Sequence, residues 1–150
     1  NNEMDDFATV PGRPNQFGLV QSRRNAVAPR KRPLSSMSPT IVEDAGGQVR
    51  MAAGSPGGPT IINVVLQVLL NGIDHGMDVA AAVGAPRIHH QWLPDELVVE
   101  PGFRDAIQGL RGLGHGVVER RLGDVQAVFV VDREATGASD PRHCGRTIVV

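Results

Sequence analysis

A glycine-rich turn that leads into an apolar segment constrains the fold of this chain most strongly. Residues 54–58 read Gly-Ser-Pro-Gly-Gly, and residues 61–70 are apolar except at two positions. Glycine permits sharp turns, and proline is favoured at the first position of a helix. The sequence therefore predicts a strand, a tight turn and a helix over residues 59–71 that ends at Gly72. Because apolar side chains lie on nearly all sides of this helix, we expect it to be buried between layers.

The remaining pattern alternates short strands and helices. Strands are expected over residues 40–43 and 48–53, joined by an Ala-Gly-Gly turn that suits a hairpin. Further expected elements are strands over 97–100, 117–120 and 125–132 and helices over 77–83 and 103–113. The first 39 residues are rich in turns. Together these features predict one α+β domain over residues 1–150, with helices packed on a largely antiparallel sheet.

Composition and charge argue against several classes of function. Of 150 residues, 41% are hydrophobic and the net charge is −1, which is typical of a globular domain with a core. Four Phe, one Trp and no Tyr disfavour a stacking surface for nucleic acid, and the near-neutral charge disfavours a basic DNA-binding protein. No apolar run reaches 18 residues, so no membrane span is expected. Cys144 is the single cysteine, and the five histidines lack metal-ligand spacing, so we expect neither metal nor cofactor.

The glycine turn is also the first candidate site. Backbone N–H groups at the start of a helix can hold a phosphate, a carboxylate or an oxyanion, and here Gly57 and Gly58 would supply them. No Gly-Lys-Ser/Thr follows and no Gly-x-Gly-x-x-Gly is present, so neither a P-loop nor a dinucleotide fingerprint is indicated. A plain strand-to-helix turn and a generic phosphate site remain alternatives.

Two polar clusters could bind a charged ligand. Glu3, Asp5 and Asp6 lie within four residues, and clustered carboxylates suit an ammonium group or a hard cation. Ser35 and Ser36 carry hydroxyls that can donate hydrogen bonds to a carboxylate. The alternatives are an acidic surface turn for the first cluster and local capping of turn backbone for the second.

Several longer strings resemble one known family. NNEMDDF, PNQFGLV, NAVAPRKRPLSSMSPTIV, GSPGGPTIINVVLQVLLNGIDHGM and APRIHHQWLPDELVVEPGF are similar to the later part of the small, catalytic subunit of γ-glutamyltranspeptidase (glutathione hydrolase). The resemblance covers nearly the whole chain, as far as Arg142. It implies an N-terminal-nucleophile hydrolase fold, an αββα sandwich of two stacked sheets between helix layers, of which this chain would form only part.

The resemblance also implies an activity and site roles. A precursor would cleave itself, and the new N-terminal Thr, upstream of this chain, would attack γ-glutamyl amides such as glutathione with its α-amino group as general base. Glu3 and Asp6 resemble the acids that bind the donor ammonium group, and Asp5 resembles a structural residue. The pair Ser35 and Ser36 resembles the hydroxyls that hold the donor carboxylate. The oxyanion hole would be formed by the backbone N–H groups of residues 57 and 58.

The implied partners are the large subunit of the same precursor and acceptor amino acids or peptides. Without the nucleophile, residues 1–150 alone are expected to be inactive. One alternative is an amide hydrolase of the cephalosporin acylase type. Another is a non-catalytic member that binds only glutamyl ligands or a partner chain. By resemblance alone, we expect a periplasmic or secreted location.

Overall fold

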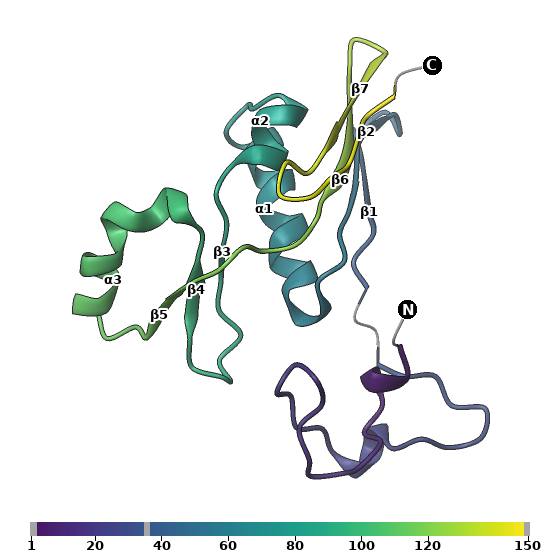
Figure 1. Cartoon of the computed structure of the whole chain (residues 1–150). Coiled ribbons are helices and arrows are strands. Elements are labelled where there is room, and N and C mark those ends of the chain that lie inside the picture. The colour runs from purple at the N-terminus through teal and green to yellow at the C-terminus, as the bar shows by residue number, and fades with distance from the viewer. Residues whose placement is uncertain (1–2, 35–36, 149–150) are drawn as a thin grey trace.

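The computed structural model describes residues 3–34 and 37–148 (Figure 1). In chain order the strands are β1 (Thr40–Glu43), β2 (Val49–Gly54), β3 (Ile88–His89), β4 (Leu97–Val99), β5 (Val117–Glu119), β6 (Gln126–Val131) and β7 (Glu134–Ser139). The α-helices are α1 (Ile61–Ile73), α2 (Val79–Gly84) and α3 (Ile107–Gly112). Short 3₁₀ helices cover Glu3–Asp6, Arg23–Asn25, Gly58–Thr60 and Pro101–Ala106.

The strands form two sheets. The larger has the order β1-β2-β6-β7 and is antiparallel throughout. The smaller has the order β3-β4-β5, in which β3 and β4 are antiparallel and β4 and β5 are parallel. The expected α+β class with largely antiparallel sheets is therefore confirmed. The expected hairpin of β1 and β2 is also present, and β6 reaches β2 only after the chain has passed through the helices and the small sheet.

The hydrophobic core lies between the large sheet and the helices α1 and α2, which cover one of its faces (Figure 1). Alternate side chains of each strand point to this face. Met51 of β2 and Phe129 of β6 are paired in the register, so their side chains lie next to each other on the same face of the sheet. Phe129 is buried, as are Val64 and Val68 of α1. A continuous apolar contact between sheet and helices thus holds the glycine turn, which connects β2 to α1.

The outer faces carry apolar side chains that stay exposed. On the sheet face away from the helices, Ile41 and Val128 are 68% and 42% exposed. On α1, Ile62 and Leu66 are 58% and 50% exposed. The expectation that this helix is buried on all sides is therefore wrong for the described residues, because its core contacts involve only one face.

Helix boundaries differ from the predicted ones for packing reasons. The expected helix over 59–71 is a 3₁₀ turn followed by α1, and α1 continues through Gly72 to Ile73. Gly72 lies within the helix and does not end it. Its lack of a side chain leaves room for the core residues Phe129 and Met51. A Cβ there would lie 2.7 Å from the ring of Phe129. The expected helix over 103–113 is likewise a 3₁₀ helix followed by α3. The helix expected over 77–83 is α2, which begins two residues later, at Val79, after the capping carboxylate of Asp78.

The strands β3 and β7 were not predicted from the sequence. The hairpin of β6 and β7 turns at Asp132 and Arg133, whose φ angles are +51° and +68°. Two positive φ angles are typical of a type I′ hairpin turn, but Asn-Gly or Asp-Gly usually signals it. β7 itself contains Gly137 and only one β-branched residue, Thr136, so its propensity for strand is low.

Residues 3–34 form a largely irregular segment held by polar contacts. Asn25 Nδ2 donates to the backbone oxygen of Asp6, and the Ala8 N–H donates to the oxygen of Asn25. Asp5 accepts the N–H of Gln16 on its carboxylate at 3.2 Å, in agreement with the structural role implied for it. Within the described residues, no helix has the length and apolarity required to cross a membrane, and no three His, Cys, Asp or Glu side chains group as metal ligands would.

Candidate functional site

The turn between β2 and α1 has a conformation that only glycine adopts easily. The φ angles of Gly57 and Gly58 are +145° and +56°. A Cβ on Gly58 would lie 2.4 Å from the ring of Phe17, which packs against the turn. Among the described residues, no backbone or side-chain acceptor receives the N–H of either glycine. Two adjacent N–H groups are thus available to an oxygen atom carrying negative charge.

A small cavity of about 230 Å³, here called the Asp6 cavity, lies on one side of this turn. Half-buried Asp6 and Gly58 both line it, together with Leu34, which immediately precedes Ser35. Phe17 and Pro59 complete the wall nearest the turn. The fold therefore brings one predicted ammonium-binding acid and one predicted oxyanion-binding glycine to the same cavity, although 52 positions separate them in the sequence.

The other predicted site residues are placed only in part. Glu3 begins the 3₁₀ helix that Asp6 ends, so both belong to one helical turn, but the side chain of Glu3 is outside the described structure. Ser35 and Ser36 lie outside the described residues. The roles of all six candidate residues therefore stay predictions.

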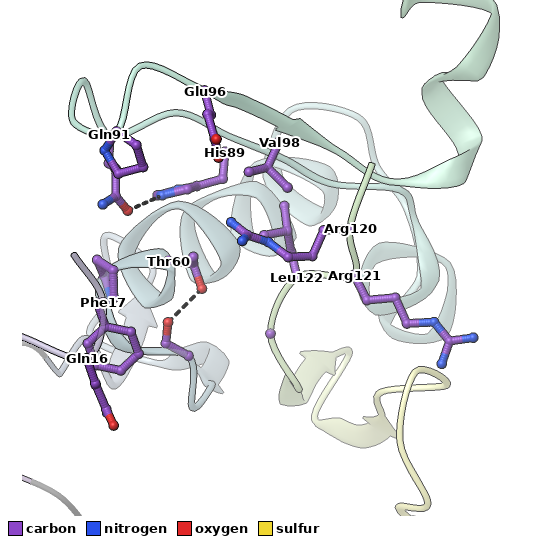
Figure 2. A pocket seen from close by; sticks show the side chains of 14 residues that line it. Gln16, Phe17, Thr60, His89, Gln91, Glu96, Val98, Arg120, Arg121 and Leu122 are labelled. Carbon is purple, nitrogen blue, oxygen red and sulfur yellow. Dashed lines mark hydrogen bonds between the residues drawn. The ribbon is translucent and has the colours of Figure 1, made fainter. Parts of the chain in front are cut away.

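A second cavity of about 380 Å³, here called the Arg120 cavity, also adjoins the turn (Figure 2). Gly57 contributes to its wall, and Phe17 and Pro59 line both cavities. His89, Glu96 and Arg120 approach it from the small sheet and its flanking loops. The glycine turn thus contributes to two neighbouring cavities, Gly58 to the Asp6 cavity and Gly57 to the Arg120 cavity.

His89 is part of the wall of the Arg120 cavity and is not available as a general base. Its Nδ1 lies 3.1 Å from Asn63 Nδ2, and its Nε2 lies 2.8 Å from Gln91 Oε1. An amide nitrogen can only donate and an amide oxygen can only accept, so Nδ1 accepts and Nε2–H donates. The neighbouring His90 points outward and pairs with Asp95 at 3.1 Å. The two neighbouring histidines therefore have different hydrogen-bond partners.

Residues 122–125, of which Leu122 and Gly123 line the Arg120 cavity, are anchored by a buried network of two arginines and two carboxylates. Arg87 donates to Asp140 at 2.7 Å and to the Leu122 oxygen at 2.8 Å. Arg142 pairs with Glu100 and, at 3.0 Å, with Asp140. Three backbone N–H groups of the segment donate hydrogen bonds to side chains: Leu122 to Glu100 at 2.8 Å, Val125 to Asp140 at 2.8 Å and Asp124 to Ser55 Oγ at 3.0 Å.

The carboxylates of this network are charged in spite of their burial. Burial raises the pKa of the Glu100 carboxyl, but hydrogen bonds from Arg142 and from the Leu122 N–H outweigh that effect and lower its pKa below the ordinary value. Burial likewise raises the pKa of Asp140, and the backbone N–H groups of Val125 and Arg142 together with the Arg87 guanidinium lower it further than burial raises it. The network therefore consists of paired ions.

Sequence reasoning from single motifs missed the network and the Arg120 cavity. Charged residues are rarely buried without a partner. Arg87 and its partner Asp140 are 53 positions apart, so no local motif shows that they pair. The only signal was that Arg87 and Arg142 lie in strings shared with the family that the chain resembles. Arg120 lies in none of the quoted strings, so no sequence signal marked it.

Comparisons with known proteins support the resemblance. The family model described as gamma-glutamyltranspeptidase matches residues 1–150. The glutathione hydrolase proenzyme of Escherichia coli (strain K12) is 54% identical over 145 residues, which is 95% of this chain and 25% of that protein. The chain thus spans about a quarter of the length of this curated relative.

Solved structures agree with the fold. A γ-glutamyltranspeptidase variant from Helicobacter pylori matches 95% of this chain with a TM-score of 0.88 and 47% identity, and the match covers 80% of that chain. The enzyme from Pseudomonas nitroreducens in complex with L-DON matches 100% of this chain and 80% of its own, with a TM-score of 0.90 and 40% identity. The sequence matches and the shared N-terminal-nucleophile hydrolase fold agree, and the chain belongs to the γ-glutamyltranspeptidase family.

Proposed function

We propose that the protein containing this chain cleaves γ-glutamyl amides such as glutathione and transfers the γ-glutamyl group to water or to acceptor amino acids or peptides. The observation that carries this proposal is the glycine turn, in which Gly58 lines the cavity that contains Asp6 and the adjacent Gly57 lines the neighbouring Arg120 cavity. Fixed N–H donors stabilise the oxyanion of a tetrahedral intermediate in acyl transfer. The relative named glutathione hydrolase proenzyme supports this choice of substrate.

The cavity residues would select a glutamyl group through both of its charges. Asp6, with Glu3 from the same helical turn, would bind the α-ammonium group, and Ser35 and Ser36 would donate hydrogen bonds to the α-carboxylate. The γ-carbonyl oxygen would then lie at the glycine turn. A ligand that lacks either charge would leave a polar group of the protein without a hydrogen-bond partner, and this cost would weaken its binding.

The remaining parts of the catalytic unit would come from outside residues 1–150. We propose that the nucleophile is the N-terminal Thr of a self-processed precursor, that a large subunit of the same precursor is the partner, and that the protein is periplasmic or secreted. The exposed apolar side chains of Ile41 and Val128 on the sheet and of Ile62 and Leu66 on α1 support a partner, because large apolar faces are normally covered. Separation of cell fractions tests the location.

Replacing Asp6 by Ala in the full-length protein tests the donor site. Removing one member of a buried charge pair costs roughly 3–5 kcal/mol, so kcat/KM for a γ-glutamyl anilide should fall by about 100-fold or more. Asp5→Asn is the matched control. Its carboxylate accepts a backbone N–H of Gln16, and the Asn side chain retains an acceptor for that bond. Unchanged kcat and KM in Asp6→Ala would show that Asp6 does not bind the donor.

The same assay separates the alternatives. A glutaryl anilide lacks the α-ammonium group, so an acylase of the cephalosporin type would hydrolyse it at least as well as the γ-glutamyl compound. A non-catalytic family member would hydrolyse neither compound and would still bind glutamate. Hydrolysis of the γ-glutamyl anilide alone is the result expected from our proposal.

A further inference from the structure

The Arg120 cavity carries one positive side chain that the fold leaves unused. Several polar side chains of its lining are already occupied: Thr60 Oγ1 donates to the Gly57 oxygen at 2.9 Å, and His89 and Gln91 bind each other. Among the described residues, no hydrogen bond or ion pair involves the guanidinium of Arg120. Figure 2 shows this side chain extending toward Thr60 and His89 across the cavity.

The adjacent Arg121 differs in both respects. Its side chain extends to the opposite side in Figure 2, and its Nη1 donates to the backbone oxygen of Arg142 at 3.4 Å. Arg121 also lines the cavity, but of the two guanidiniums it is Arg120 that Figure 2 shows extending into it. Glu96 supplies one carboxylate to the same lining and so balances the charge of Arg120. This balance suits a small zwitterion and disfavours a multiply charged anion such as phosphate.

We propose that Arg120 binds the carboxylate of the acceptor and thereby selects acceptors that carry a free carboxylate. This inference rests on the proposed function. If the γ-carbonyl oxygen lies at the glycine turn, the attacking amine must approach from beside that turn. The Asp6 cavity would hold the donor, and the Arg120 cavity adjoins it, because Phe17 and Pro59 line both. Its volume of about 380 Å³ is within the range of small-molecule sites.

The transfer step balances with the groups named. The neutral amine nitrogen of the acceptor forms a bond to the γ-carbonyl carbon of the glutamyl ester, and the bond from that carbon to the Thr oxygen breaks. One amine proton goes to the departing Thr oxygen, which regenerates the hydroxyl. A guanidinium that pairs with the acceptor carboxylate in two parallel hydrogen bonds would fix the direction of the amine.

The test compares two acceptors in the full-length protein. Glycylglycine has a carboxylate, and its C-terminal amide has the same shape without the charge. In Arg120→Gln we expect the KM for glycylglycine to rise by about tenfold or more, with little change for the amide. Arg120→Lys, which retains the charge but not the planar fork, should recover part of the loss. Arg111→Gln is the matched control, because Arg111 does not line the cavity and donates to the backbone oxygen of Val117, and it should match the parent protein with both acceptors.

The outcomes separate this inference from the proposed function. If the parent protein hydrolyses the γ-glutamyl anilide in water and Arg120→Gln changes the KM for both acceptors equally, the inference is wrong and the proposed function stands. If the parent protein does not cleave the γ-glutamyl donor, the proposed function is wrong. Calorimetric titration with glycylglycine still decides the site in that case. Weaker binding to Arg120→Gln than to the parent supports it, and equal binding overturns it.

Discussion

Replacing Arg87 by Met tests whether the buried ion network holds the wall of the Arg120 cavity. The side chains of Arg87 and Asp140 are 1% and 0% exposed. Arg87 also donates to the backbone oxygens of Leu122 and Val83, so its guanidinium joins the cavity wall to the end of α2. Methionine fills a similar volume without the charge, so the substitution removes the interactions and little of the packing.

The size of the effect follows from the charges that remain. The network contains two guanidiniums and two carboxylates, and removal of Arg87 leaves one excess negative charge in a site without solvent. Breaking a buried pair in this way costs about 3–5 kcal/mol. At about 1.4 kcal/mol per factor of ten, local opening of the wall should become about 100 to 4,000 times more favourable.

Hydrogen exchange measured by mass spectrometry on the full-length protein reports this opening. The amide of Val125 donates to Asp140, so its exchange should accelerate toward the predicted factor. Arg104→Met is the control, because the Arg104–Glu119 pair lies at the surface and such pairs contribute little. If exchange at Val125 in Arg87→Met stays within about threefold of the parent protein, the reasoning on the network is wrong.

Two further predictions concern stability. Gly72→Ala should lower the unfolding free energy by about 1–3 kcal/mol, because the added methyl group would collide with Phe129. Gly109→Ala, on the exposed side of α3, should raise the unfolding free energy by up to about 1 kcal/mol. Melting temperatures that shift in the same direction in both variants would contradict this reasoning. The pKa values of Glu100 and Asp140 are lowered in the folded protein, so their contribution is complete above the ordinary carboxyl pKa and is lost as the pH falls through the folded values. The melting temperature should therefore fall below about pH 4, with a smaller fall in Glu100→Gln, and a constant melting temperature there would refute the assignment.

Local patterns predicted the elements that local forces decide. The strand over residues 40–43 was predicted at its observed bounds, since alternating residues and an adjacent glycine turn are features of neighbouring positions. Gly72 was misread because a glycine late in a helical pattern usually ends the helix, and only the distant Phe129 shows its use. β7 was missed because its strand conformation depends on pairing with β6 and not on its own propensity.

The candidate site divides in the same way. Gly57 and Gly58 stand out in the sequence because the turn needs positive φ angles, and Asp6 stands out as a member of an acidic cluster. That Asp6 and Gly58 line one cavity depends on how residues 3–34 pack against the turn. Arg120 has no motif of its own, and its candidacy comes entirely from the occupied side chains around it.

The sequence by itself determined the α+β class, the glycine turn before α1 and the membership of the γ-glutamyltranspeptidase family, because propensities, turn chemistry and family motifs all act over short stretches of chain. The tertiary structure alone decided which charges are buried together, which face of α1 enters the core and which cation faces a cavity. These properties depend on contacts between residues such as Arg87 and Asp140, 53 positions apart. Their energies arise from the exclusion of water when distant segments meet, and the sequence of a single segment does not contain that information.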